Sequence, residues 1–148
     1  MRIAIGSDHA GYELKNTIVK YLLKKKIEVH DMGTFSKDSV DYPDFAVQVC
    51  KSIKRDANDL GILICYTGIG MSMAANKVNG IRAACCSDIF SAKFTRLHND
   101  ANVLCLGARV VGEGLAWELA ETFVNTEFEG GKHARRVGLI ADIEKMQK

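Results

Sequence analysis

The residues of most chemical interest in this 148-residue chain lie around Cys65. An apolar run, Ile62–Ile64, precedes this cysteine, and the glycine-containing stretch 66–72 leads from it into a segment that can be helical. This pattern predicts a strand that ends in a thiol and turns through glycines into a helix. The first N–H groups of a helix lack partners and carry partial positive charge, so they stabilise an oxyanion and favour ionisation of a nearby thiol. The sequence therefore predicts a reactive thiol beside an anion-binding loop.

Spacing limits which chemistry the Cys65 loop can support. A thiol phosphatase needs an arginine six positions after the cysteine, where this chain has Met71. A nucleotide P-loop is excluded because no Gly-Lys-Ser/Thr occurs in the sequence. A dinucleotide loop is a weak match, since Gly68 and Gly70 lack a third glycine, although Asp88 lies near the right distance for a ribose contact. A thiol hydrolase stays open, as does a Cys65 that is merely a small apolar residue ending a buried strand.

Other ionisable side chains follow the predicted strands and helices. His9, next to Asp8, comes directly after the first strand, and Arg109 directly after the last. His98 lies on the connection that follows an amphipathic helix. Each would ordinarily be a solvated polar group, and Asp8 could simply cap a helix. Basic residues also open the last predicted helix, where positive charge is unfavourable and an anionic ligand would explain it: Lys132, His133, Arg135 and Arg136.

Composition excludes several classes of protein. A hydrophobic content of 47% and a charged content of 26% are typical of one soluble globular domain. The net charge of +2 comes from dispersed Lys and Arg, which argues against nucleic-acid binding. Five cysteines without a Cys-x-x-Cys pair indicate reduced thiols and no cysteine metal site. Neither a membrane span nor a signal peptide is apparent, so we expect a cytoplasmic protein without a membrane partner.

Apolar runs alternate with amphipathic segments along the chain, as in a parallel sheet covered by helices. Strands are expected near residues 3–5, 27–30, 61–65, 81–85 and 103–106. Helices are expected between them, one of them capped by Ser87, and a final helix over 134–146. No repeat or linker composition divides the chain, which predicts a single domain over 1–148. Ligands bind at the carboxyl ends of parallel strands, so the segments that follow the strands form the candidate site.

Several motifs together indicate a known family. They are Gly6-Ser7-Asp8-His9-Ala10-Gly11, Asp41-Tyr42-Pro43, Cys65-x-Thr67-Gly68-x-Gly70, Gly80-Ile81-Arg82-Ala83, Arg96-x-His98-Asn99-Asp100-x-Asn102, Gly107-x-Arg109-Val110 and Glu129-Gly130-Gly131-x-His133. Over essentially its whole length the chain resembles the type B ribose-5-phosphate isomerases, whose family includes the galactose-6-phosphate and allose-6-phosphate isomerases. The resemblance implies a Rossmann-like three-layer α/β/α sandwich with a mainly parallel five-stranded sheet.

The resemblance also implies an activity and roles for residues. The enzyme would interconvert D-ribose 5-phosphate and D-ribulose 5-phosphate through a cis-enediolate, without metal or organic cofactor. Cys65 would move the proton between C1 and C2, His98 would open the sugar ring, and Thr67 would assist proton movement on the substrate oxygens. The N–H groups of residues 68–72 could form the cradle that an enediolate needs. The expected substrate-binding residues are Asp8, His9, Tyr66, Gly68, Ile69, Gly70 and Asn99, with Arg109, Lys132 and Arg136 on the phosphate.

A homodimer with shared active sites, or a dimer of dimers, is implied as well. His98, Asn99 and Arg109 would come from the partner subunit, and the C-terminal helix would pack on it. One branch of the family replaces the cysteine base by a Glu at the position of Met71, so this chain resembles the thiol-base branch. Lys132 stands where many relatives have arginine, and lysine lacks the bidentate grip on phosphate.

Two alternatives stay open at this point. One is a six-carbon phosphosugar isomerase that acts on allose 6-phosphate or galactose 6-phosphate. The other is a noncatalytic nucleotide- or phosphate-binding module.

Overall fold

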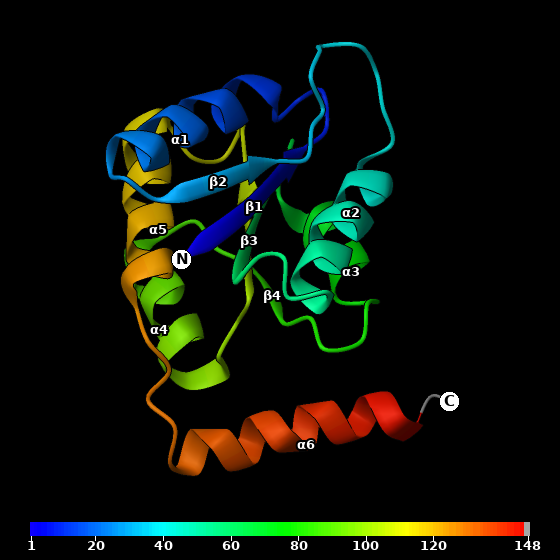
Figure 1. Ribbon diagram of the computed structural model, residues 1–148, viewed down its shortest axis with the longest axis vertical. Coiled ribbons are helices and arrows are strands. Elements are labelled where there is room, and N and C mark those ends of the chain that lie inside the picture. The colour runs from blue at the N-terminus through cyan, green and yellow to red at the C-terminus, as the bar shows by residue number, and fades with distance from the viewer. Residues whose placement is uncertain (147–148) are drawn as a thin grey trace.

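Parallel strands form the centre of the fold (Figure 1). The computed structural model describes residues 1–146. The strands are β1 (Arg2–Ser7), β2 (Glu28–Asp31), β3 (Leu60–Cys65), β4 (Ala83–Cys85) and β5 (Val103–Gly107), in the order β2-β1-β3-β5-β4. Every pairing between them is parallel, and β3 and β5 are buried along their whole length. Burial on both faces explains why these strands read as continuous apolar runs. The predicted five-stranded parallel sheet is confirmed.

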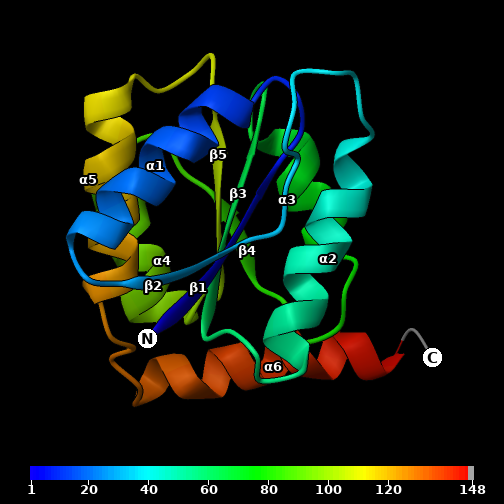
Figure 2. The same cartoon turned by 45° about the horizontal axis from the view of Figure 1, so that its top comes forward.

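Helices cover both faces of this sheet (Figures 1 and 2). One face carries α1 (Tyr12–Lys24), α4 (Ile89–Asn99) and α5 (Glu113–Asn125); the other carries α2 (Tyr42–Lys54) and α3 (Ile69–Ala75). Ile18 and Phe123 pack on the first face, and Val49 and Met71 on the second, all fully buried. Each such side chain contributes roughly 1.5–3 kcal/mol by leaving water. The predicted three-layer sandwich is confirmed.

The strand order creates a crevice where β1 and β3 end. The chain leaves β1 toward β2 on one side and enters β3 on the other, and ligands bind in such sheets where the connections diverge. The turn after β1 packs tightly against the end of β3, because Asp8 N–H donates to Ile64 O at 3.2 Å. A Cβ on Gly11 would lie 2.5 Å from that same oxygen. The Asp8 turn and Cys65 are therefore neighbours.

Several element boundaries differ from the sequence prediction. Strand β4 begins at Ala83 instead of 81, because the Asn102 side chain accepts the N–H of Arg82 and donates to Gly80 O, both at 2.8 Å. Asp88, not Ser87, caps α4, and its Oδ1 accepts a backbone N–H at 2.7 Å. The last helix, α6 (Lys132–Met146), begins two positions before the predicted start at 134.

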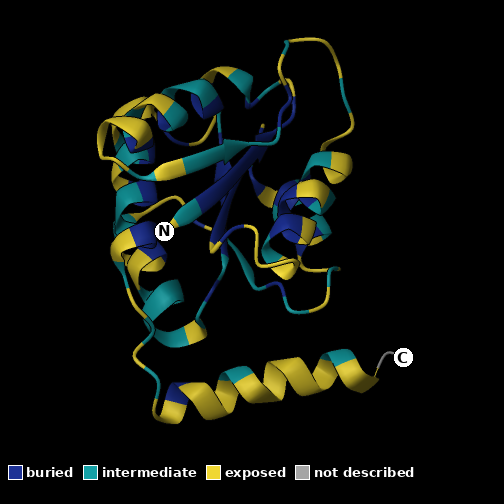
Figure 3. Ribbon diagram, viewed as in Figure 1, coloured by how far each residue is buried: buried dark blue, intermediate teal, exposed yellow. Residues whose placement is uncertain are grey.

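Helix α6 lies across the end of the sheet where the strands begin (Figure 2). It contacts α4, and Glu144 accepts the N–H of Gly80 at 2.7 Å. Most of the helix is exposed (Figure 3), and a cleft of about 440 Å³ remains between it and the sheet. Its exposed apolar side chains include Leu139, Ile143 and Met146. A single chain thus leaves an apolar face of α6 uncovered. None of the helices within residues 1–146 has the length and apolar character needed to span a membrane.

Candidate active site

Cys65 is the last residue of β3 and is buried beneath the loop that follows it. Its Sγ accepts a hydrogen bond from Gly68 N–H at 3.2 Å. Gly68 has a φ of 81°, where a side chain is strained, and a Cβ there would lie 2.8 Å from the carbonyl carbon of Leu106. Glycine therefore lets the loop fold back closely enough to place a backbone donor against the sulfur.

Three of the other cysteines are poorly suited to act as bases. Burial raises the pKa of Cys50 and of Cys86 to about 11, and it raises the pKa of Cys105 well above its ordinary value. Desolvation disfavours the charged thiolate in each case. All three belong to the buried core, as the sequence predicted.

The N–H groups predicted as an oxyanion cradle are only partly free. Gly68 donates to Cys65, and Ile69 donates to Thr67 Oγ1 at 3.3 Å. Ser72 donates to Gly68 O at 3.1 Å as the helix begins. The N–H groups of positions 70 and 71 have no partner within residues 1–146. Met71 is fully buried, whereas Gly70 is partly exposed, so the N–H of Gly70 is the one available for an oxyanion.

Asp8 and His9 lie in the adjoining turn. Asp8 is buried, and its Oδ1 accepts Gly11 N–H at 3.0 Å within the turn. The N-cap of α1 is Gly11, without a side-chain cap hydrogen bond, so the Asp8 cap considered from the sequence is wrong. His9 is exposed, and its Nδ1 accepts Val40 N–H at 3.2 Å. A ring nitrogen that accepts carries no proton, so His9 is the tautomer with its proton on Nε2. That N–H is a donor available to a ligand.

Tyr42 is a site residue to which the sequence analysis assigned no role. A Cβ on Gly70 would lie 2.8 Å from Cζ of the Tyr42 ring, so this ring packs directly on the Cys65 loop. The signal was its place in the Asp41-Tyr42-Pro43 motif. Only the fold shows that α2 begins beside α3.

Arg109 follows β5 and lies beside the same loop. Its backbone N–H donates to the backbone carbonyl of Tyr66 at 3.1 Å, and its guanidinium lies over the Tyr66 ring, 5.8 Å from the ring centroid. It also lines a cavity of about 250 Å³ together with Ala10 and Glu13. Arg109 therefore groups with Cys65 of its own chain, and the implied grouping with His98 and Asn99 is wrong because β5 ends next to β3.

We call the predicted residues gathered here the Cys65 edge. They share the carboxyl ends of β1, β3 and β5: Asp8, His9, Cys65, Tyr66, Thr67, Gly68, Ile69, Gly70 and Arg109.

The other predicted residues belong to the last turn of α4 and the start of α6, and α6 lies at the opposite end of the sheet (Figure 2). We call this set the His98 edge: His98, Asn99, Lys132 and Arg136. The expectation that His98 lies on a connection is wrong, because α4 extends to Asn99 and holds His98 in its last turn. This helix ends near the starts of the strands, where Asn102 O accepts the N–H of Gly61 at 2.8 Å. From Gly61 to Cys65 the strand rises about 13 Å. Since α4 ends beside the start of β3 and Cys65 is the last residue of that strand, one chain does not bring Cys65 and His98 together.

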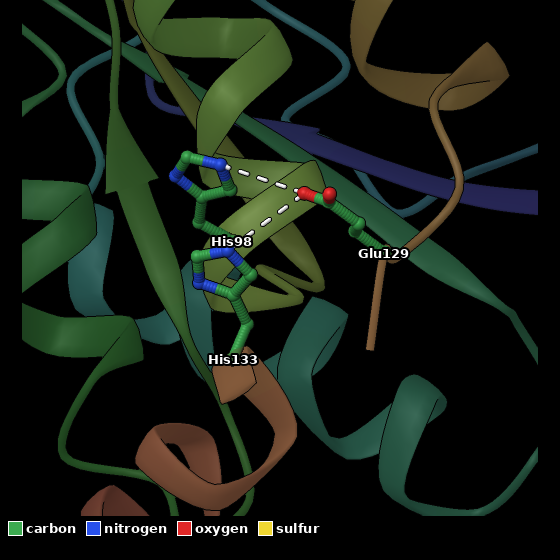
Figure 4. A group of neighbouring side chains, drawn as sticks. All are labelled: His98, Glu129 and His133. Atoms are coloured by element: carbon green, nitrogen blue, oxygen red, sulfur yellow. Dashed lines mark ion pairs between the residues drawn. The ribbon is translucent and has the colours of Figure 1, made fainter. Parts of the chain in front are cut away.

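His98 belongs to a cluster that the sequence did not predict (Figure 4). Its Nε2 lies 3.6 Å from Oε2 of Glu129, and Nε2 of His133 lies 3.7 Å from the same oxygen. The two imidazole rings stack, with centroids 4.0 Å apart and planes 8° from parallel. Burial lowers the pKa of His133, and the neighbouring His98, Lys132 and Arg136 lower it further, whereas Glu129 opposes them. The pKa of His133 is therefore below its ordinary value.

The ligand atoms of His98, Glu129 and His133 all lie within 4.8 Å of one another, which raises the question of a metal ion. An imidazole binds a metal through a lone pair in the plane of its ring. Two nearly parallel rings 4.0 Å apart cannot both aim their lone pairs at one ion. The arrangement instead suits a carboxylate shared by two imidazoles.

Comparisons with known proteins agree over almost the whole chain. The model of the Ribose/Galactose Isomerase family matches residues 3–140. The chain is 47% identical over 144 residues to ribose-5-phosphate isomerase B of Escherichia coli (strain K12), covering 97% of both. Its structure matches that of Clostridium thermocellum ribose-5-phosphate isomerase B with a TM-score of 0.98, 53% identity and 100% coverage of both chains. The enzyme from Mycoplasma genitalium with bound ribulose-5-phosphate matches with a TM-score of 0.93 at 44% identity, covering 97% of this chain and 96% of that chain.

Proposed function

Because the chain belongs to the ribose/galactose isomerase family, we propose that it interconverts D-ribose 5-phosphate and D-ribulose 5-phosphate. The observation that carries this proposal is the Cys65 loop, where the thiol accepts the Gly68 N–H beside the free N–H of the partly exposed Gly70. The names of the Escherichia coli and Clostridium thermocellum relatives, and the ligand of the Mycoplasma genitalium enzyme, support the five-carbon substrate.

Proton transfer is assigned to Cys65. As a thiolate it takes the proton from C2 of open-chain ribose 5-phosphate, and the C2–H electrons form a C1=C2 bond while charge moves to the oxygens. The thiol then returns the proton to C1, and the C2 ketone forms as the Thr67 hydroxyl moves a proton between the two oxygens. A positioned general base contributes about 10²–10⁴-fold. The free N–H of Gly70 would stabilise the enediolate charge.

Ring opening and part of the phosphate binding require the His98 edge. We therefore propose that two copies form a homodimer in which the Cys65 edge of one faces the His98 edge of the other. Two-fold symmetry makes two such sites. The phosphate would lie between Arg109 of one protomer and Lys132 and Arg136 of its partner. The uncovered apolar face of α6 would be buried in this contact.

The proposed function concerns the chain as one unit. Residues 1–148 form a single isomerase domain in a cytoplasmic enzyme with reduced thiols, although the last two residues lie outside the described part. The enzyme needs no metal or organic cofactor for the chemistry described above.

A coupled assay of ketose formation tests the function. Ribose 5-phosphate, allose 6-phosphate and galactose 6-phosphate are compared at matched concentrations with the parent and with Cys65→Ala. We expect the highest kcat/KM with ribose 5-phosphate and a loss of at least about 100-fold in Cys65→Ala. A higher kcat/KM with either six-carbon sugar phosphate would contradict ribose 5-phosphate as the substrate and favour that sugar phosphate instead. Near-parental turnover by a folded Cys65→Ala protein would remove the thiol mechanism, and binding of NAD or ATP without any turnover would favour the noncatalytic module.

A further inference from the structure

Glu129 is an acidic residue beside the His98 edge, and the mechanism above does not use it. We propose that Glu129 is a positioning residue, whose carboxylate fixes the ring orientation and the tautomer in which His98 opens the sugar ring. This inference rests on the proposed function, and it adds a residue that acts through His98 without touching the reacting atoms.

The backbone holds Glu129 against the end of α4. Its N–H donates to Leu97 O at 3.1 Å, directly before His98 in the chain. Arg96 Nε donates to Thr126 O at 3.2 Å, which fixes the start of the same segment. The Glu129 carboxylate is therefore tied to the helix turn that carries His98.

Packing restrains the His98 ring but does not choose between its two flipped orientations. His133 stacks on one side with a centroid separation of 4.0 Å, and Phe94 contacts the ring edge-on at 4.9 Å. A flip of the imidazole exchanges nitrogen and carbon positions with almost no change in shape, so these contacts tolerate both orientations. In the orientation observed, Nε2 faces Glu129 Oε2 at 3.6 Å (Figure 4). This contact is longer than a hydrogen bond and acts electrostatically, and a carboxylate favours an N–H over a lone pair at the nitrogen that faces it.

The tautomer matters for ring opening. With the proton fixed on Nε2, Nδ1 of His98 keeps a lone pair. This nitrogen can take the proton from the anomeric hydroxyl as the C1–ring-oxygen bond breaks and the C1 carbonyl forms, and it then gives the proton to the former ring oxygen. The histidine ends unchanged, and the sugar has only isomerised from cyclic to open chain.

The test uses Glu129→Gln, with Glu127→Gln as the matched control. Glu127 is exposed on the same segment and forms no ion pair with any residue from 1 to 146. Two rates are measured for each protein: turnover of ribose 5-phosphate, and exchange of the C1 hydrogen of ribulose 5-phosphate with D₂O. Ribulose 5-phosphate has no free C5 hydroxyl to close a furanose ring, so the exchange reports Cys65 chemistry without ring opening.

We expect Glu129→Gln to lower turnover of ribose 5-phosphate about 10-fold or more, with exchange within about twofold of the parent. Glu129→Asp should recover part of the turnover, and Glu127→Gln should match the parent. Equal losses of turnover and exchange would mean a merely structural role and would overturn the inference, as would unchanged turnover. A parent that neither turns over nor exchanges would instead reject the proposed function.

A second measurement does not depend on activity. Imidazole ¹⁵N chemical shifts report the His98 tautomer in the protein alone. The parent should carry the neutral-ring proton on Nε2, and Glu129→Gln should show a mixture of the two tautomers. A proton on Nδ1 in the parent would overturn the inference.

Discussion

Two inactive variants should restore activity when they share a dimer. In a mixed dimer of Cys65→Ala and His98→Asn, one site joins the two altered edges and the other joins the two intact edges. Purified mixed dimers should therefore have about half of the parental turnover, and random 1:1 exchange, which makes half of the dimers mixed, should give about a quarter. The expectation follows from the separation of the two edges in one chain, where Cys65 and Gly61 stand about 13 Å apart along β3.

The assay is ketose formation from ribose 5-phosphate by mixed dimers purified through two different affinity tags. The matched control pairs Cys65→Ala with Arg109→Ala. Both changes lie on the Cys65 edge, so each of the two sites in the mixed dimer contains one altered residue and neither is intact. His98→Asn paired with Arg109→Ala should restore activity. Absence of restoration in verified mixed dimers of Cys65→Ala and His98→Asn would refute the shared site. Restoration in the control pair would place Arg109 on the His98 edge.

Three further predictions concern stability. Gly68→Ala should lower the Tm, because a side chain at a φ of 81° costs about 1–2 kcal/mol and its Cβ would also lie 2.8 Å from a backbone atom. Gly138→Ala, which has open space in a helix, is the control and should be neutral or stabilising. Equal Tm values of the two variants in calorimetry would contradict this prediction. Lys15→Met should lower the free energy of unfolding in urea by about 1–3 kcal/mol, because the fully buried Lys15 ammonium lies 2.5 Å from the Asp31 carboxylate. The loss should be smaller than for a fully buried ion pair, since Asp31 is partly exposed. An unchanged unfolding midpoint would mean that this ion pair does not stabilise the fold. Asp88→Ala should lower the Tm at neutral pH, because the Asp88 carboxylate caps α4. A hydrogen bond from a backbone N–H holds the pKa of Asp88 below its ordinary value, so the cap is lost as the pH falls through that pKa and the two proteins should then have the same Tm. A Tm difference that persists in acid would exclude the ionised cap as its cause.

The sequence by itself determined the elements and the Cys65 loop. Buried parallel strands leave continuous apolar runs, and helices that pack on one side leave a spacing of three or four residues, so both are readable from neighbouring positions. The loop was predictable for the same reason. Cys65, Thr67 and Gly68 are adjacent in the chain, and their contacts depend on local backbone conformation.

The tertiary structure decided which distant segments meet. The strand order places β5 beside β3, which puts Arg109 over Tyr66, and the return of α4 carries His98 to the far edge. The packing of α2 on α3 sets Tyr42 on Gly70, and residues 126–133 bring Glu129 and His133 to His98. These contacts join residues far apart in the chain, and their geometry depends on how whole strands and helices pack. Local periodicity contains no record of that packing.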